Sequence, residues 1–386
     1  MIRDLASLLA PVSEEDFLGH FLEKKRLHVK SDDPARAAPL FAWTTINHLI
    51  QADVLPPDRF RVARSNVDLL PTMYRYKDGA QQLRAGALQA LLPQGVSLVI
   101  NGVSDLVPEI GRLTDAIERR LGHRSWVNAY LSFGRGSALK AHWDEHDVLV
   151  LQIHGKKRWR SFGTPVPFPV AKHNAGNDLG SEVVWEGLLE PGDVLYLPRG
   201  EVHEAVVEEK SSVHVTFGIQ TLSAIDFLGW ITELAARHEV ARSDLTRAAG
   251  DTVLREHEAR VKERLHALID STSLAAYLDS EDSKRKPRPL FSLGLAETLN
   301  PTTIIVPALR RRVPIPIEPE GEIPVVVGGE THRLSAVARR ILDLLFSCNE
   351  TTVADLAAAL GAGVAESTLR STLVDLSKAG LLGLES

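Results

Sequence analysis

Cysteine is almost absent from this chain. Cys348 is the only one in 386 residues, which excludes an internal disulfide and a metal site built from clustered cysteines. The chain also lacks an apolar run long enough to cross a membrane, and the apolar stretch after Met1 is too short to predict a secretory signal. These absences predict a protein of a reducing, cytoplasmic compartment without membrane contact.

An excess of basic charge is missing as well. The formal net charge is -6, which argues against a general nucleic-acid-binding surface. An apolar content of 44% and a charged content of 24% are typical of a globular protein. A length of 386 residues predicts two or three domains rather than one core.

Three regions with different patterns follow one another along the chain. Residues 1–223 contain many short strand patterns punctuated by Gly and Pro, which is typical of a β-sandwich or barrel. Residues 224–290 change to helical periodicity between Ile225 and about Leu278, and then contain a polar stretch, Ser280–Pro289, that we expect to be a solvated linker. The strand candidates of the first region are Ser97–Val103, Ser125–Phe133, His146–His154, Arg158–Phe162, Val183–Leu189, Asp193–Leu197 and Ser211–Thr221.

Residues 291–386 end in a pattern that predicts a winged helix. Its helix candidates are Ser335–Ser347, a second from Thr351 or Thr352 to Gly361, and Ser367–Ala379, before the apolar pair Leu381-Leu382. The last helix would be the recognition helix, and it is nearly neutral because Glu366 and Asp375 offset Arg370 and Lys378. DNA readout normally uses several cations there, so we expect a structural or protein-contacting role and no DNA binding.

Two spaced motifs carry candidate metal ligands. The first reads Gly136-Ser-Ala-Leu-Lys-Ala-His142-Trp-Asp144, and the second reads Gly192-Asp-Val-Leu-Tyr-Leu-Pro198-Arg-Gly200-Glu-Val-His203. Side chains two apart on a strand share a face, so His142 and Asp144 are predicted to point together into a barrel. With His203 they form a set of two imidazoles and one carboxylate, which suits Fe(II) and leaves coordination positions open, whereas a structural zinc site uses four ligands.

These motifs resemble the two halves of a metal-binding cupin barrel. Cupins generally carry a second His where this chain has Asp144, and a Glu where it has Val148. Three further histidines are weaker candidates. His146 shares the parity of the motif, and a role toward the substrate is left open, whereas His154 and His173 are expected to be exposed.

A second polar set lies on the neighbouring strand candidates. Lys157 is a candidate point charge for the distal carboxylate of a keto-acid cosubstrate. Alternation predicts that Asn128 and Tyr130 on one strand, and His214 and Thr216 on another, face the barrel interior. The residues alone leave an alternative open, in which Lys157 is a solvated charge at a strand end and Tyr130 belongs to the core.

Together the motifs resemble the ribosomal oxygenases, which are cupin-like members of the Jumonji-C group of 2-oxoglutarate-dependent oxygenases. The matching segments are Asn128-Ala-Tyr130, His142-Trp-Asp144, Asp147-Val-Leu-Val-Leu-Gln152, Gly155-Lys-Lys157-Arg-Trp159, Pro191-Gly-Asp-Val-Leu-Tyr-Leu-Pro-Arg-Gly200, His203 and Ser212-Val-His214-Val-Thr216. The resemblance implies a mainly β fold with α-helices: a double-stranded β-helix barrel in residues 1–223, a helical dimerisation region in residues 224–290, and a C-terminal winged helix in residues 291–386.

The resemblance also implies roles for single residues. His142, Asp144 and His203 would bind Fe(II), and Lys157 would pair with the distal carboxylate of 2-oxoglutarate. Asn128, Tyr130, Thr216 and, on the same face, His214 would line the cosubstrate and substrate pocket. Bacterial relatives often have Arg at the position of Lys157, and Lys resembles the eukaryotic branch.

The implied activity is hydroxylation of an Arg or His side chain of a protein, for example a ribosomal protein, by a homodimeric enzyme. Two alternatives stay open. One is an oxygenase that acts on a peptide natural product or a small molecule. The other is a non-catalytic module in which the metal cupin senses a ligand and the winged helix binds a partner or DNA.

Overall fold

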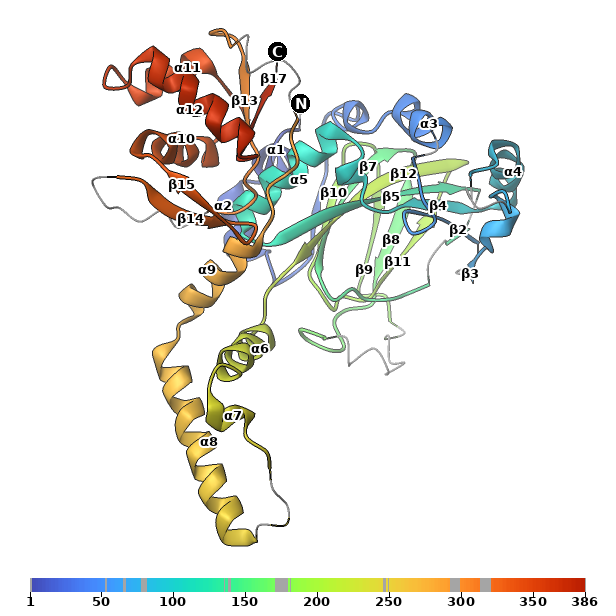
Figure 1. The fold of residues 1–386 in the computed structure, drawn as a ribbon. Coiled ribbons are helices and arrows are strands. Elements are labelled where there is room, and N and C mark those ends of the chain that lie inside the picture. The colour runs from blue at the N-terminus through green and yellow to red at the C-terminus, as the bar shows by residue number, and fades with distance from the viewer. Residues whose placement is uncertain are drawn as a thin grey trace. The chain divides into compact units, whose positions relative to one another are not determined.

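The computed structural model describes residues 2–52, 54–64, 67–77, 82–134, 136–137, 140–170, 180, 182–245, 248, 250–291, 299–312 and 321–385. The chain divides into two compact units, Met1–Thr221 and Leu222–Ser386 (Figure 1). In these described ranges no helix is both long enough and apolar enough to cross a membrane.

Two facing β-sheets form the centre of the first unit (Figure 1). One sheet has the strand order β1-β10-β7-β12-β5-β4-β2-β3, and the other has the order β6-β11-β8-β9. The strands are β1 (Leu27–Val29), β2 (Phe60–Arg64), β3 (Val67–Asp68), β4 (Ser97–Ile100), β5 (Arg124–Phe133), β6 (Gly136–Ser137), β7 (Asp147–His154), β8 (Lys157–Ser161), β9 (Trp185–Leu189), β10 (Val194–Leu197), β11 (His203–Val207) and β12 (Ser211–Gln220).

Helices add the outer layer of this unit. They are α1 (Leu5–Leu9), α2 (Glu14–His20), α3 (Trp43–Gln51), α4 (Ala85–Leu91) and α5 (Pro108–Leu121), with short 3₁₀ turns between them. Pro108 at the first turn and Gly122 at the C-cap, with φ +70°, fix the ends of α5. Apolar residues of these helices pack on one face of the larger sheet: Phe17 of α2 and Ile110 of α5 share a core with Leu151 of β7.

Strand β7 shows why the second face of the larger sheet is different. Leu149, Leu151 and Ile153 join the core under the helices, whereas Val148 and Val150 join a smaller core between the two sheets. Every residue from Asp147 to Ile153 is buried, because β7 is covered on both sides. The inner face, between the sheets, is therefore the place where polar side chains are removed from bulk water.

All the strands predicted from the sequence are present, with their ends within three residues of the expected positions. Strand β11 and helix α5 are among the elements of this unit that the sequence pattern did not predict, as are β2, β3, α3 and α4. The prediction that His142 and Asp144 lie on a strand is wrong. They precede β7 in an irregular segment, in which His142 forms an isolated bridge with His203.

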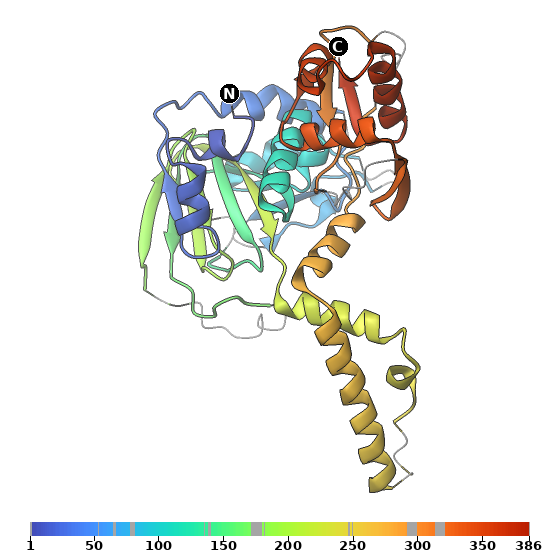
Figure 2. The same ribbon diagram turned by 90° about the vertical axis from the view of Figure 1, so that its left-hand side faces the viewer.

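The second unit begins with the helices α6 (Ala224–Ala235), α7 (Glu239–Arg242), α8 (Asp251–Ser271) and α9 (Leu274–Lys284). Ile231 and Ala235 of α6 pack against Leu268 near the C-terminal end of α8, the long gold helix in Figure 2. Helix α9 overturns part of the linker prediction for Ser280–Pro289, since it continues to Lys284. Tyr277 anchors α9 against Phe227, with ring centroids 5.7 Å apart.

The remaining elements of this unit enclose a core of their own. They are β13 (Ile304–Pro307), β14 (Ile323–Val327), β15 (Glu330–Leu334), α10 (Ala336–Phe346), β16 (Thr351–Thr352), α11 (Val353–Leu360), α12 (Glu366–Lys378) and β17 (Leu382–Glu385). The three predicted helices are thus present. Strand β17 pairs with β13, which precedes the three helices, and β13 also pairs with β16. The assignment of this region as a winged helix stays a prediction.

Gly155, in the turn between β7 and β8, should tolerate no side chain. Its φ is +62°, and a Cβ would lie 2.1 Å from the carbonyl oxygen of Ser211. Gly155→Ala is expected to lower the free energy of unfolding by about 2 kcal/mol or more, measured by urea denaturation. Gly19→Ala is the matched control, because Gly19 is exposed in helix α2 with no atom near the added methyl group, and there we expect a gain of about 0.5–1 kcal/mol. Equal stability of the two variants would contradict the argument.

Candidate active site between the sheets

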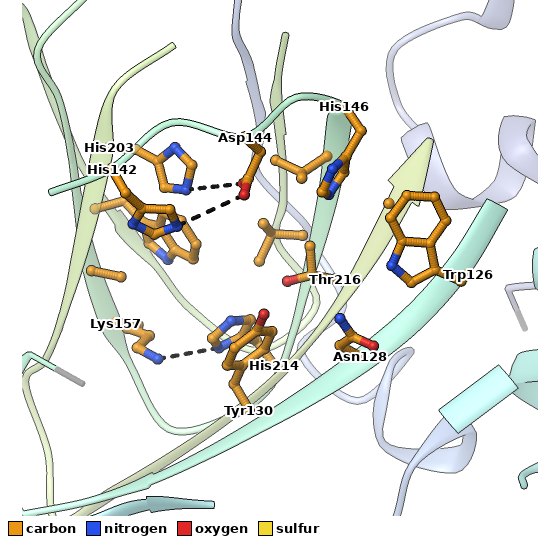
Figure 3. A pocket seen from close by; sticks show the side chains of 15 residues that line it. Trp126, Asn128, Tyr130, His142, Asp144, His146, Lys157, His203, His214 and Thr216 are labelled. Atoms are coloured by element: carbon orange, nitrogen blue, oxygen red, sulfur yellow. Dashed lines mark hydrogen bonds and ion pairs between the residues drawn. The ribbon is translucent and has the colours of Figure 1, made fainter. Parts of the chain in front are cut away.

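Two histidines and one aspartate converge at one end of the space between the sheets (Figure 3). One ligand atom from each of His142, Asp144 and His203 lies within 4.8 Å of the others. The Nε2 atoms of His142 and His203 lie 3.9 Å and 3.6 Å from the carboxylate oxygens of Asp144. Within the described ranges, no other group of three or more His, Cys, Asp or Glu residues has this geometry.

Backbone carbonyls orient both imidazole rings. His142 Nδ1 lies 2.8 Å from the carbonyl oxygen of Lys140, and His203 Nδ1 lies 2.9 Å from that of Glu201. A carbonyl oxygen only accepts hydrogen bonds, so each Nδ1 donates its hydrogen and each Nε2 keeps a free lone pair. Both lone pairs belong to the ring edge that faces Asp144, as a metal site requires.

Hydrogen bonds across the irregular segment bring the ligands together. His142 and His203 exchange backbone hydrogen bonds of 3.1 Å and 2.8 Å, and the carbonyl oxygen of Asp144 accepts from Gly200 N at 2.9 Å. The convergence therefore depends on pairing with the start of β11, and not on the alternation of a single strand.

The donor set fits a divalent metal that keeps open coordination positions. Val148 lines the same cavity as the three ligands, and its side chain offers no donor atom. Burial first, and then the neighbouring His142, lower the pKa of His203 to about 4, so its ring is neutral and able to ligate near neutral pH. Two imidazoles with one carboxylate match the ligand pattern of non-haem Fe(II) sites better than that of closed zinc sites.

A cavity of about 220 Å³ extends from these ligands along the inner faces of β5, β12 and β8 (Figure 3). Asn128, Tyr130, His214 and Thr216 all line it, in agreement with the alternation of their strands. The rings of Tyr130 and His214 stack with centroids 4.9 Å apart and an interplanar angle of 6°. Their contact with a cosubstrate stays a prediction.

Lys157 lies at the far end of the cavity and is only 3% exposed. The alternative of a solvated charge at a strand end is therefore wrong. Its Nζ donates to Ser132 Oγ at 3.2 Å and lies 3.3 Å from His214 Nδ1. Burial lowers the pKa of Lys157 to about 7. Burial, and then the charge of Lys157, hold the pKa of His214 well below its usual value, so that this ring accepts from the ammonium.

The ammonium of Lys157 has no carboxylate partner within the described part of the chain. A buried cation without an anion is expensive, and a bound anion would remove that penalty. The cavity thus combines a metal-binding end with a cationic end.

Trp126, Trp159 and Gly218 also line the cavity, and the sequence analysis did not select them. Each lies two residues from a selected position on its own strand, so the same parity argument would have found them. Gly218 makes room for Trp126, because a Cβ there would lie 2.5 Å from the indole.

The three additional histidines differ from one another in the structure. His146 lines the cavity beside Trp126, with ring centroids 4.7 Å apart. The prediction that His154 is exposed is wrong, since it is half-buried and stacks on Trp43 with centroids 5.2 Å apart. His173 lies outside the described residues.

Comparisons with known proteins agree with this geometry. A family model described as "JmjC domain" matches residues 105–227, which include the three candidate ligands and Lys157. The chain is 27% identical over 256 residues to the "bifunctional lysine-specific demethylase and histidyl-hydroxylase NO66" of Drosophila willistoni. That match covers 62% of this chain and 32% of the relative, so the chain spans about a third of that protein's length.

A second relative is matched over more of its length. The "ribosomal oxygenase 2" of Mus musculus is 26% identical over 323 residues, which cover 76% of this chain and 67% of the relative.

The fold is similar to that of YcfD, a ribosomal oxygenase of Escherichia coli. Its structure in complex with cobalt and 2-oxoglutarate gives a TM-score of 0.61 at 17% identity, and covers 97% of this chain and 99% of that chain. A further YcfD structure gives a TM-score of 0.62 at 18% identity. This likeness shows a Jumonji-C cupin fold with mixed α and β structure. The family model, the relatives and the metal-site geometry together confirm the resemblance found in the sequence: residues 105–227 match the JmjC domain, and the chain is similar to the ribosomal oxygenases.

Proposed function

We propose that the chain is an Fe(II)- and 2-oxoglutarate-dependent oxygenase that hydroxylates an Arg or His side chain of a protein, with a ribosomal protein as the substrate class. The observation that carries this proposal is the presence, in one cavity, of an open metal triad and a buried cation that has no carboxylate partner among the residues the structure describes. A 2-oxo acid with a second, distal carboxylate matches both ends of that cavity.

Different residues of the chain would bind the metal and the two ends of 2-oxoglutarate. His142, Asp144 and His203 would hold Fe(II), and the coordination positions they leave open would receive the 2-oxo and C1 carboxylate oxygens of 2-oxoglutarate. Lys157 would bind the distal carboxylate, with Ser132 fixing its Nζ. Tyr130, Thr216, Asn128 and His214 would line the space between these ends and exclude water.

The bound iron and 2-oxoglutarate would supply the oxidising chemistry, in which O₂ and 2-oxoglutarate yield succinate, carbon dioxide and one oxygen atom inserted into a substrate C–H bond. The chain would place that C–H bond beside the triad. Trp126 and His146 line the cavity and are not needed for the cosubstrate, so they are the residues available to contact the substrate side chain.

The names of the relatives support the substrate class. One is called a histidyl-hydroxylase, and others are called ribosomal oxygenases. Oxidation of a peptide natural product or a small molecule on the same scaffold, and ligand sensing without turnover, are the alternatives that the experiments below separate.

The helices of residues 224–290 are the proposed homodimer interface. Ile225, Leu228, Leu274 and Leu278 are between 44% and 61% exposed within this unit. Exposed apolar side chains gathered on a few helices are typical of surfaces that another chain covers. The winged helix proposed for residues 291–386 would act as a protein-contacting or structural module, since helix α12 pairs its Arg370 with Glu366.

Asp144→Ala should abolish turnover. Loss of the carboxylate ligand is expected to reduce succinate formation from 2-oxoglutarate under air by roughly 100-fold or more, since even the loss of residues that orient ligands costs about 10- to 100-fold. Wild type incubated with ribosomal proteins should add the mass of one oxygen to an Arg or His side chain. Glu145→Ala, at the exposed neighbouring residue, is the control and should retain activity. Modification of free peptides alone would favour the small-substrate alternative, and metal binding without any turnover would favour the sensor.

The affinity for 2-oxoglutarate should depend on pH through Lys157. Its pKa of about 7 means that the ammonium is present below that pH and is lost as the pH rises through it. The dissociation constant of 2-oxoglutarate, measured by calorimetry on Co(II)-loaded protein, should be level below about pH 6 and rise up to about tenfold per pH unit above pH 7. Lys157→Arg keeps its charge and should lose this dependence. The same slope in both proteins would assign the titration to another group.

Leu228→Glu should convert the dimer into a monomer. A carboxylate placed in the proposed apolar interface would be desolvated without a partner, which disfavours association by about several kcal/mol. The measurement is the molar mass from light scattering after size exclusion. Val326→Glu is the matched control, because Val326 is 41% exposed on β14, outside the proposed interface. A dimer that survives Leu228→Glu, or a wild type that is monomeric, would rule out this interface.

A further inference from the structure

A buried carboxylate that the proposed chemistry does not use lies two residues before His203. Glu201 is only 4% exposed. Its Oε1 accepts from Ser161 Oγ at 2.5 Å and from Arg26 Nη1 at 3.0 Å. Ser161 is fully buried and is the direct cross-strand neighbour of His203 in the pairing of β8 with β11.

The backbone of the same residue contacts the ligand. The carbonyl oxygen of Glu201 accepts the hydrogen of His203 Nδ1 at 2.9 Å, and its N–H donates to the carbonyl oxygen of Pro198 at 3.2 Å. The side chain and the backbone of Glu201 are therefore both fixed. Rotation of this peptide would break the bond that sets the tautomer and orientation of the His203 ring.

Arg26 connects this carboxylate to the N-terminal segment of the chain. It lies just before β1, and its guanidinium stands over the ring of Trp185 at 5.7 Å. The same segment has a second attachment, since Glu23 N donates to Tyr196 Oη at 2.7 Å and Tyr196 Oη donates to Asp147 Oδ2 at 2.5 Å. Residues 23–26 are thus tied to the turn before β11 through Glu201 and, through Tyr196, to Asp147 at the end of the irregular segment that carries His142 and Asp144.

The second attachment continues to the turn that precedes β11. Asp147 Oδ1 accepts from Arg199 N at 2.8 Å, and the next residue, Gly200, donates to the carbonyl oxygen of Asp144. The turn 198–201 is therefore held by hydrogen bonds at Arg199, Gly200 and Glu201. None of these bonds uses an atom that would coordinate the metal.

We propose that Arg26 and Glu201 are a positioning pair that holds His203 in the tautomer and orientation needed for metal binding. This inference rests on the proposed metal site. A buried carboxylate requires compensation, and Arg26 with Ser161 supplies it. The pair would fix the carbonyl oxygen of Glu201, which accepts the hydrogen of His203 Nδ1. Its loss should therefore lower the metal affinity of the protein even in the absence of turnover.

The test is Co(II) binding by calorimetry, together with the visible absorption of the bound Co(II), which reports ligand geometry. Glu201→Ala should weaken Co(II) binding by about 10- to 100-fold and change that absorption. Glu201→Gln retains an oxygen that accepts from Ser161 and Arg26, so it should restore the affinity to within about threefold of wild type. Glu204→Ala is the matched control. Glu204 lies on β11, as His203 does, and its carboxylate forms a 3.5 Å ion pair with Arg160 of the neighbouring strand β8. Its side chain has the opposite parity to that of His203, so its loss should leave the affinity unchanged.

Arg26→Met keeps most of the side-chain volume and tests the pair from its other side. It should weaken Co(II) binding by about tenfold, and it serves as the deciding variant if the thermal melt of metal-free Glu201→Ala shows that it does not fold. Wild-type affinity in folded Glu201→Ala or in Arg26→Met would overturn the positioning role. Failure of wild type itself to bind Co(II), or equal binding by His142→Ala, would instead overturn the proposed metal site.

Discussion

The structure depends on strand β12, which pairs with β5 on one side and β7 on the other. All three strands bury their outer side chains under helices, as Val215, Phe217 and Leu149 do, so the opposite parity must face the other sheet. A register shift between Val213 and His214 in the pairing with β7 is the kind of irregularity that redirects a side chain next to a site. The polar inner face is thus a consequence of how the outer face is packed.

The cavity is lined by buried ionisable side chains, whose burial does not by itself stabilise the fold. Lys157, His203 and His214 are each at least 94% buried, and burial lowers the pKa of all three. Neutral imidazoles at one end of the cavity can bind a metal cation. The ammonium of Lys157, which holds its proton weakly because it is buried, can bind an anion at the other end. Together these two ligands would compensate the buried groups, which gives a physical reason for placing both in one space.

The parts of the site on regular strands could be predicted from the sequence, because a period of two assigns each residue to a face. Asn128, Tyr130 and Thr216 follow that rule. Lys157 follows it too, although the sequence left open whether its side chain is buried or solvated. Helix α5 was also open to prediction from Pro108 and Gly122, whose positions mark helix ends. Strand β11 was open to prediction too, since Glu-Ala-Val-Val continues from His203 with a composition typical of a strand.

The placement of the ligands could not be predicted in the same way. A His-x-Asp spacing suggests a shared face on a strand, yet the segment around His142 is irregular and is held by one bridge to His203. The bonds that bring the ligands together join residues about 60 apart in the sequence, among them Gly200 N to the carbonyl oxygen of Asp144. Because such bonds depend on where two turns meet, local pattern carries no information about them. The motif therefore identifies the ligand atoms, and the turn before β11 determines whether those atoms converge.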